Sequence, residues 1–445
     1  MSNSSGPARR VVITGIGVVS PVGIGLQAFR DSLAARRSGI GVVERLDHLA
    51  VPGNVAGEVR DFSEDVPKEI FGRLLDKKAK TQMTKSLRLM CREIQLGVTA
   101  AMLALEDAGV QIDPQADNER LGVDFGANLM FSPPSVLKDA CWTCTDDDLR
   151  FHYEQWGDKG LSKMEPLWLL KYLPNMPACH IGIAARACGP NNSITLAEAS
   201  GMLAVGEAFR VLTRGHADMM IAGTTGTRVH PVKSIHARLW DALAQEEGPP
   251  ETWYRPFDAQ RTGQVVGEGA CAFILEEEES AKARGATVLG RVLGAGSSCV
   301  LDQSGKPDLR QALVNAMRAA LRDADLGPGD IGHINAHGLG SREGDAQEAA
   351  AIHEVFGELA AKVPVTALKS YFGNSGSGCG PLELAASIVG LRNGGVPPTL
   401  NYETPDPACD LNVVHGQPLA VEDRRLLKVN VTGMGQASAL VVEVE

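Results

Sequence analysis

The residue best placed to do chemistry in this chain is Glu198, because its local setting favours a different side chain. Residues 193–196 predict a short buried strand, a tight Ala-Glu-Ala turn follows, and the apolar-periodic run from Met202 to Leu212 predicts a helix. Such a strand–turn–helix elbow presents its central side chain at a helix N-terminus, where backbone N–H groups and the helix dipole favour negative charge. That geometry suits an activated nucleophile, such as a cysteine with a lowered pKa. This chain has a carboxylate there instead.

The residues around the elbow carry a family resemblance. Residues 189–191 read Gly-Pro-Asn, and residues 196–201 read Leu-Ala-Glu-Ala-Ser-Gly. Together with the strand and helix, they resemble the nucleophile elbow of the β-ketoacyl-ACP synthases, the condensing enzymes of fatty-acid and polyketide synthesis. In that family the elbow carries a nucleophilic cysteine. The resemblance therefore puts Glu198 at the position of the missing thiol.

The resemblance extends over nearly the whole chain. Residues 9–21 resemble the family's opening strand and turn, and the Pro-Asn-Met at 174–176 resembles the segment ahead of the elbow. Arg-Pro-Phe-Asp at 255–258 and Gly-Glu-Gly-Ala at 267–270 resemble the entry into the second half. Each of these motifs is weak alone, but together they are highly specific.

Two further motifs carry over catalytic positions. Residues 334–341 resemble the family's Asn-Ala-His-Gly-Thr-Gly-Thr loop, so His337 matches the first catalytic histidine. Residues 369–374 resemble Lys-Ser-x-x-Gly-His, which retains Lys369 and replaces the second histidine by Asn374. The N–H of an asparagine amide can point at an oxyanion as an imidazole N–H does. The resemblance thus implies a catalytic set of Glu198, His337 and Asn374, with Lys369 behind it.

Departures from the family pattern cluster around the same predicted pocket. The loop 430–436 resembles Asn-Ser-Phe-Gly-Phe-Gly-Gly but reads Asn-Val-Thr-Gly-Met-Gly-Gln. Both Phe positions differ, so we predict a reshaped substrate-binding pocket that includes Thr432, Gly433 and Met434. Leu339 stands where the family has Thr after His-Gly, and we assign it to the same pocket. Scaffold glycines are mostly retained while polar residues change, which indicates a retained fold with altered chemistry.

The alternation of predicted strands and helices indicates an α/β protein with mixed sheets covered by helices. The resemblance implies the thiolase fold, in which two similar halves form a layered α-β-α-β-α arrangement. We predict an N-terminal half at 1–253, with an insertion around 131–170, and a C-terminal half at 254–445. The insertion has no clear period, and we interpret it as a cover over the site or a subunit contact. A long apolar-periodic run predicts a single helix over 84–104.

Composition excludes several classes of function. With 445 residues, of which 44% are hydrophobic and 22% charged, the chain can bury a large core and is typical of a soluble globular protein. Its net charge of -11 argues against a nucleic-acid-binding protein. The leader 1–7 is small and polar, and no apolar run approaches ~18 residues. We therefore expect a cytoplasmic protein with no secretory signal and no membrane span.

The nine cysteines are scattered, which suits a reducing cytoplasm better than a disulfide framework. Cys141 and Cys144 form a lone Cys-x-x-Cys without a second pair at zinc-finger spacing, and we interpret them as unpaired thiols in a loop. Cys379 is a conceivable replacement nucleophile, but we interpret it as a small packing residue. We expect neither a metal nor a cofactor.

The chemistry of a carboxylate at the elbow limits the function. A condensing enzyme needs a thiolate to hold the acyl chain as a thioester. Acyl transfer to Glu198 would give a mixed anhydride, which is quickly hydrolysed. The carboxylate would also repel a malonyl carboxylate by about 1 to 4 kcal/mol at ~4 Å. The donors His337 and Asn374 could still serve a substrate that is not covalently bound.

Several hypotheses remain open. The first is a non-condensing partner similar to the chain-length factors of aromatic polyketide synthases, or a modified synthase acting on carrier-bound acyl thioesters in fatty-acid or polyketide biosynthesis. The alternative is a malonyl-carrier decarboxylase, or another thiolase-fold enzyme that uses Glu198 as a general base. The third is either an ordinary synthase that has lost its thiol or a purely structural dimer in which Glu198 bonds to the elbow amides.

The expected partners are an acyl carrier protein and a second subunit, in a homodimer or in a heterodimer with a ketosynthase. One basic cluster stands out in this acidic chain: Lys77, Lys78, Lys80, Lys85 and Arg88. It is either a solvated helix face or a landing patch for an acidic carrier protein, since complementary charge speeds encounter.

Overall fold

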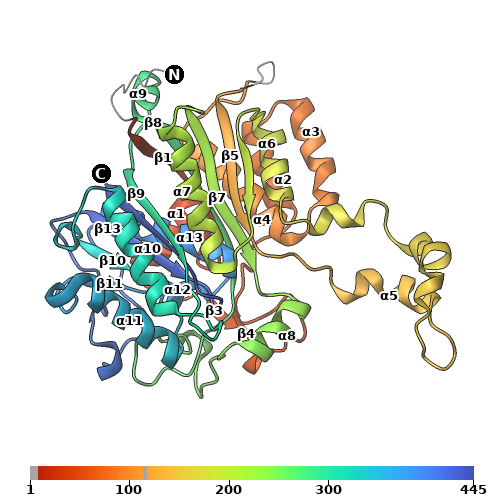
Figure 1. Cartoon of the computed structure of the whole chain (residues 1–445). Helices are drawn as coiled ribbons and strands as arrows, with labels where there is room; N and C mark the ends of the chain where they lie inside the picture. The colour runs from red at the N-terminus through yellow and green to blue at the C-terminus, as the bar shows by residue number, and fades with distance from the viewer. Residues whose placement is uncertain (1–8, 114–117) are drawn as a thin grey trace.

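A computed structural model describes residues 9–113 and 118–445 and shows a mixed α/β protein (Figure 1). The polar leader 1–7 lies outside these residues. The main sheet has the strand order β12-β11-β10-β13-β14-β9-β1-β8-β7-β5-β6, with the short β2 paired to β1. A separate two-stranded ribbon is formed by β3 and β4. In the described part of the chain, no helix is both long and apolar enough to cross a bilayer.

The main sheet consists of two parts with the same pairing pattern. In the first, β5 is parallel to β6 and β7, while β8 is antiparallel to both β7 and β1. In the second, β10 is parallel to β11 and β13, while β14 is antiparallel to both β13 and β9. The strands are β1 (Val11–Ser20), β5 (Leu121–Ala127), β6 (Asn191–Ile194), β7 (Met219–Thr227), β8 (Glu268–Glu277), β9 (Gly290–Cys299), β10 (His333–Asn335), β11 (Pro364–Thr366), β13 (Arg425–Val431) and β14 (Gln436–Val444).

The repeated pattern confirms that the fold consists of two similar halves. They are joined edge to edge by a short antiparallel contact, in which Val11 to Ile13 of β1 pair with Gly290 to Val292 of β9. The boundary at 253/254 stays a prediction. The strand β8 follows this boundary in the chain but pairs with β1 and β7 of the first half.

Helices cover both parts of the sheet in layers. The helices α7 and α13 lie between the two parts and share one buried apolar cluster with strands of both. A second cluster packs α2, α4 and α6 on the outer face of the first part, and a third packs α10 and α11 on the outer face of the second. These layers confirm the α-β-α-β-α arrangement. The helices are α2 (Asp65–Leu74), α4 (Arg92–Asp107), α6 (Met176–Ala185), α7 (Ser200–Thr213), α10 (Leu309–Asp323), α11 (Arg342–Phe356) and α13 (Cys379–Arg392).

Smaller elements complete the fold around this framework. They are α1 (Leu26–Ala34), α3 (Lys77–Ser86), α5 (Pro134–Thr143), α8 (Pro231–Trp240), α9 (Glu278–Ala283), α12 (Lys369–Phe372), β2 (Gly23–Ile24), β3 (Ile40–Val42), β4 (Val55–Gly57) and β12 (Asn412–Val413).

Three local predictions were wrong. Cys141 lies in α5 rather than in a loop, and Cys144 directly follows that helix. The strand before the elbow is Asn191–Ile194 rather than 193–196, and it is half-exposed or exposed rather than buried, because it pairs only with β5 at the edge of the sheet. The helix predicted over 84–104 is broken: α3 ends at Ser86 and α4 begins at Arg92. The side chain of Gln95 stabilises the break, because its Nε2 donates to the backbone oxygens of Met90 at 3.1 Å and Leu87 at 3.4 Å.

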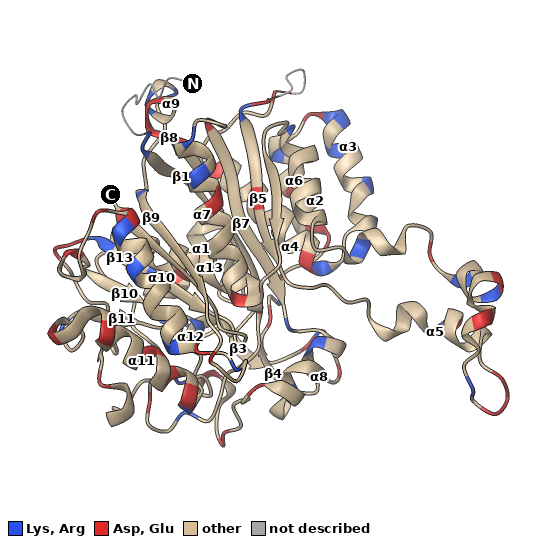
Figure 2. Ribbon diagram, in the orientation of Figure 1, with Lys and Arg blue, Asp and Glu red and all other residues tan. Residues whose placement is uncertain are grey.

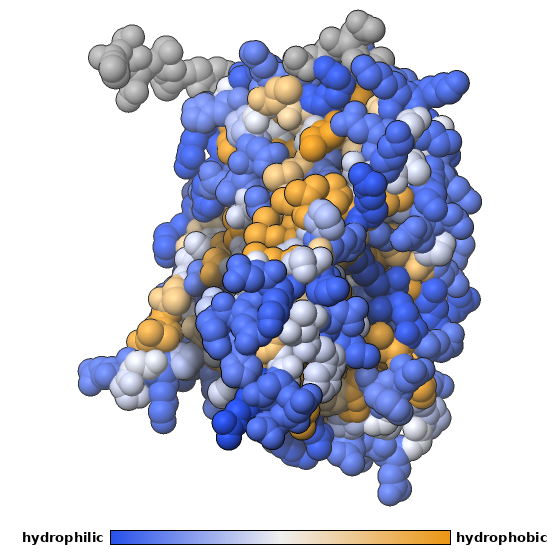
Figure 3. All heavy atoms as spheres, turned by 90° about the vertical axis from the view of Figure 1, so that its right-hand side faces the viewer, coloured by the Kyte–Doolittle hydropathy of each residue, from blue (hydrophilic) through white to orange (hydrophobic). Residues whose placement is uncertain are grey.

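The predicted insertion is an arm that projects from the body of the molecule (Figure 1). It contains α5 followed by short helical turns at Tyr153–Gln155, Trp156–Gly160 and Leu161–Lys163. Apolar side chains gather on the face that carries this arm (Figure 3). The exposed ones within or next to the arm are Leu129, Trp142, Leu149, Phe151, Tyr153, Leu161, Leu167 and Leu169.

The contact between β1 and α4 requires a glycine at position 17. A Cβ atom there would lie 1.9 Å from the backbone oxygen of Ala100 and 2.4 Å from the backbone nitrogen of Ala104. We predict that Gly17→Ala lowers the free energy of unfolding by about 1–3 kcal/mol, because the helix backbone must move away. Urea denaturation checks this. The control Gly157→Ala, where a Cβ meets nothing within 4 Å, should stay within about 0.5 kcal/mol of the parent. Equal effects would contradict the close packing.

Candidate active site

The elbow that presents Glu198 is a short 3-10 turn, Ala197–Ala199, between β6 and α7. Ala197 has a φ of 44°, a left-handed conformation that a non-glycine residue rarely adopts. The hydroxyl of Ser200 holds this turn, because it accepts from the backbone nitrogen of Leu196 and donates to the backbone oxygen of Ala197, each at 2.7 Å. Strained backbone of this kind persists where the surrounding structure fixes it, which is common at functional sites.

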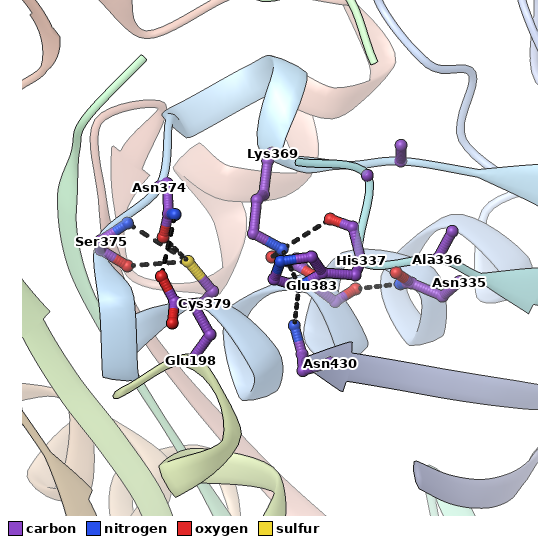
Figure 4. A network of polar contacts seen from close by, with 12 residues as sticks. Glu198, Asn335, Ala336, His337, Lys369, Asn374, Ser375, Cys379, Glu383 and Asn430 are labelled. Carbon is purple, nitrogen blue, oxygen red and sulfur yellow. Dashed lines mark hydrogen bonds and ion pairs between the residues drawn. The ribbon is translucent and has the colours of Figure 1, made fainter. Parts of the chain in front are cut away.

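The carboxylate of Glu198 contacts the side chain of Asn374 (Figure 4). The Nδ2 of Asn374 donates to Oε1 of Glu198 at 3.1 Å. The same nitrogen also donates to Oε1 of Gln264. On the other side of the amide, Oδ1 accepts from the backbone nitrogen of Gly376 at 2.9 Å and from the thiol of Cys379 at 3.2 Å. The amide orientation is therefore consistent at both ends.

This network occupies the donors of Asn374. An amide nitrogen has two N–H groups, and here one goes to Glu198 and the other to Gln264. In this conformation Asn374 has no free N–H for a substrate oxyanion. Glu198 is thus both the residue at the elbow and an acceptor for a predicted oxyanion donor.

His337 and Lys369 form the second part of the site. The Nζ of Lys369 lies 3.2 Å from Nδ1 of His337 and donates to its backbone oxygen at 2.6 Å. The Nδ2 of Asn430 also lies 3.2 Å from this Nδ1. Because both neighbours are donors, Nδ1 must accept, and the ring proton is carried by Nε2. His337 is therefore poised as a neutral N–H donor.

Burial and charge keep His337 neutral. Burial lowers its pKa well below the usual value, and the positive charges of Lys369 and Lys428 lower it further. Burial also lowers the pKa of Lys369, but nearby acidic groups, of which the Glu383 carboxylate is the first, together outweigh this effect and the net shift is upward. Lys369 lies 2.7 Å from Glu383, which also pairs with Lys428. Burial lowers the pKa of Lys428 to about 8, although Glu383 offsets part of the shift.

Cys379 lies between the two parts of the site (Figure 4). It is fully buried, and its sulfur accepts from the backbone nitrogen of Ser375 at 3.2 Å. Burial raises the pKa of the thiol to about 11, although the charge of Lys369 acts in the opposite direction. A protonated, buried thiol is a poor nucleophile, so the packing interpretation of Cys379 agrees with its surroundings.

The residues predicted to bind substrate lie at different depths. Thr432 is buried at the turn between β13 and β14, where its Oγ1 accepts from the backbone nitrogens of Met434 at 3.2 Å and Gln436 at 3.3 Å. Met434 and Gly433 are exposed at the tip of that turn, and Leu339 is half-buried two residues after His337. Their assignment to substrate binding stays a prediction.

Sequence reasoning missed two groups of the site. Glu383 is a buried acid on the apolar helix α13, and that isolated charge is a signal that could have found it. Gln264 is the polar partner of Asn374 and lies between the recognised Arg-Pro-Phe-Asp and Gly-Glu-Gly-Ala motifs. Nothing in its local sequence marks it.

Comparison with known proteins defines the family. Residues 8–281 match the beta-ketoacyl synthase N-terminal domain, and residues 289–403 match the beta-ketoacyl synthase C-terminal domain. The chain belongs to the β-ketoacyl synthase family. It is 33% identical over 407 residues to 3-oxoacyl-[acyl-carrier-protein] synthase 2 of Coxiella burnetii, covering 91% of each chain.

Solved structures agree with this membership and confirm the fold class predicted from the motifs. One similar structure is the ishigamide ketosynthase/chain length factor, with a TM-score of 0.80, 28% identity and coverage of 98% of this chain and 100% of that chain. Another is a type II polyketide ketosynthase in complex with its acyl-carrier protein, with a TM-score of 0.81, 25% identity and the same coverage.

The neutral state of His337 predicts a pH dependence of stability. An unfolded histidine titrates near 6.5, whereas the folded imidazole titrates well below its usual value. Stability from this group is present above pH ~6.5 and is lost as pH falls, because only the unfolded state takes up the proton. We predict that His337→Gln reduces the loss of unfolding free energy between pH 7 and pH 5 by about 2 kcal/mol relative to the parent.

Urea denaturation at the two pH values measures this difference. His216→Gln removes an exposed histidine and should leave the difference unchanged. If His337→Gln and the parent lose the same free energy between pH 7 and pH 5, His337 is not held neutral.

Proposed function

We propose that this chain is a non-condensing, chain-length-factor-like subunit that acts with a ketosynthase on carrier-bound acyl chains in fatty-acid or polyketide biosynthesis. The observation that carries the proposal is the Glu198 carboxylate at the elbow, hydrogen-bonded to Asn374 at 3.1 Å. The elbow has no thiol, and the nearby Cys379 is buried and protonated. Covalent acyl transfer therefore lacks a nucleophile.

The occupied donors of Asn374 support the same proposal. Decarboxylative condensation needs two donors on the developing enolate oxygen. Here both N–H groups of Asn374 already have acceptors, which leaves His337 as the donor of the predicted pair. A malonyl carboxylate that approached would also meet the negative charge of Glu198, at a cost of about 1 to 4 kcal/mol for a separation of ~4 Å.

The alternative is a malonyl-carrier decarboxylase or another enzyme in which Glu198 is a general base. One observation favours it: Glu198 is oriented by Asn374, and His337 retains a neutral imidazole held by Lys369 and Asn430. A general base needs such an orientation. The two functions differ in whether the isolated chain performs chemistry.

Partner surfaces on this chain fit a role in a complex. The strand β6 lies at the edge of the sheet with Asn191 and Asn192 exposed, and the arm exposes a set of apolar side chains. Unprotected edge strands and apolar patches are typical of protein interfaces. They are the surfaces that we propose for the partner subunit.

Substitution of Glu198 by glutamine separates the two functions. We expect that neither the parent nor Glu198→Gln releases carbon dioxide from malonyl-carrier, and that the parent changes the chain length or yield of products when mixed with an active ketosynthase. Trapped carbon dioxide and product mass spectra measure this, and intact-mass spectra of the same mixtures should show no acyl adduct at residue 198. Release by the parent that Glu198→Gln abolishes would establish Glu198 as a general base instead.

The basic cluster tests the proposed contact with a carrier protein. Lys77, Lys78, Lys80 and Lys85 are exposed on α3, and Figure 2 shows basic residues in blue along this helix. We predict that the double substitution Lys78→Glu and Lys85→Glu weakens binding of an acidic carrier protein about three- to tenfold at low salt, and less at high salt. Titration calorimetry measures the affinity. The control Lys306→Glu reverses an exposed charge elsewhere and should have little effect. Equal weakening by both variants would contradict a docking site on α3.

A further inference from the structure

Behind Asn374 lies a chain of polar side chains that no motif marked. The Oε1 of Gln264 accepts from Nδ2 of Asn374 and from Nη1 of Arg228, the latter at 3.1 Å. Arg228 in turn forms an ion pair with Asp241. Glu198, Asn374, Gln264 and Arg228 thus form one continuous line of hydrogen bonds, with a carboxylate at one end and a guanidinium at the other.

Arg228 fixes the polarity of this line at one end. A guanidinium can only donate, so the amide of Gln264 must turn its oxygen toward Arg228. That oxygen then requires a donor from Asn374, which turns its Nδ2 inward. The second N–H of this Nδ2 consequently faces Glu198. Asn374 is also held from its other side, because the backbone nitrogen of Gly376 donates to its Oδ1 at 2.9 Å. If Arg228 were absent, the Gln264 oxygen would lose one of its two donors, and the alignment of the Asn374 amide with Glu198 would loosen.

Backbone contacts hold the members of this line in place. Arg228 directly follows β7, and its backbone nitrogen donates to Gly267 at 2.9 Å. The backbone nitrogen of Gln264 donates to Ala242 at 2.8 Å, next to Asp241. The side chain of Arg228 is 16% exposed. The line is therefore built into the fold from four separate segments.

The charges of the line also balance one another. Burial alone lowers the pKa of Arg228, but the charges of Asp241 and Glu198 outweigh it and raise the pKa overall. Burial raises the pKa of Asp241; Arg228 and a hydrogen bond from Gln264 act against this rise, and the charge of Glu198 adds to it. Arg228 therefore interacts with two carboxylates, of which Asp241 is the direct partner and Glu198 the more remote one.

We infer that Arg228 is a positioning residue for the Glu198 site: through the side chain of Gln264 it acts together with the backbone N–H of Gly376 to hold the amide of Asn374 toward position 198, and it supplies the positive charge that favours an anion there. The inference concerns the geometry and charge at position 198 and does not depend on the proposed function. An assay without catalysis can test it.

A thiol introduced by Glu198→Cys reports on the electrostatic environment at that position. Its rate of alkylation by iodoacetamide as a function of pH gives its pKa, and mass spectrometry of the peptide that contains residue 198 separates it from the native cysteines. In this background we expect Arg228→Met to lower the alkylation rate at pH 7 at least fivefold, because the thiolate loses its nearby cation and its oriented amide donor. Arg228→Lys keeps the charge and should stay within about twofold of the Glu198→Cys parent.

Two further variants keep the test decisive. Arg228→Met leaves Asp241 without its partner, and this single variant could fail to fold. The double variant Arg228→Met/Asp241→Asn removes both charges and replaces it in that case. Arg214→Met removes an exposed arginine near the other end of α7 and is the matched control. Superimposable pH profiles for the parent and the folded Arg228→Met variants would overturn the inference, as would an equal change in Arg214→Met. Carbon dioxide release bears on the proposed function alone, so the two can fail separately.

Discussion

The close approach of two helix N-termini determines the geometry of the site. A Cβ on Gly201 of α7 would lie 2.5 Å from Cδ of Pro381 in α13, and a Cβ on Gly380 of α13 would lie 2.5 Å from Cγ of Met202 in α7. Each helix thus has a glycine where the other helix contacts it. This reciprocal packing brings the elbow of the first half and the segment 374–379 of the second half together, so Glu198 and Asn374 can bond although they are far apart in sequence.

The contact between these two helix ends also brings charged groups together at the site. Helix N-termini favour negative charge, and the site combines two of them with the buried cations Lys369 and Lys428 and with Arg228. Buried cations need acidic partners, because an unpaired buried charge is costly. Glu383 forms ion pairs with both lysines, and Asp241 forms an ion pair with Arg228. Against this background a carboxylate at position 198 is not anomalous, since the surroundings favour an anion whether it is a thiolate or a glutamate.

Sequence motifs predicted the central residues of the site better than the polar residues that contact them. Glu198, His337, Lys369 and Asn374 lie in strongly patterned segments, and the structure brings Glu198 to Asn374 and His337 to Lys369. Their catalytic roles stay predictions. Gln264 and Arg228 follow no period, because each is a single polar residue at the end of a strand or in a loop whose partner is set by tertiary packing. The boundaries of β6 were wrong for a related reason: a strand paired on one side needs no apolar pattern.

The orientation of Asn374 connects the fold to the chemistry that remains available. A substrate oxygen that sought this amide would have to displace either Glu198 or Gln264, and each displacement would leave a polar group without its partner. Replacing Gln264 would also disturb Arg228 and its ion pair, so Glu198 is the more easily displaced acceptor. The carboxylate therefore acts as an internal ligand of the predicted oxyanion donor. A chain built this way retains the ketosynthase architecture, while the residue at its elbow occupies an N–H group of the predicted oxyanion donor.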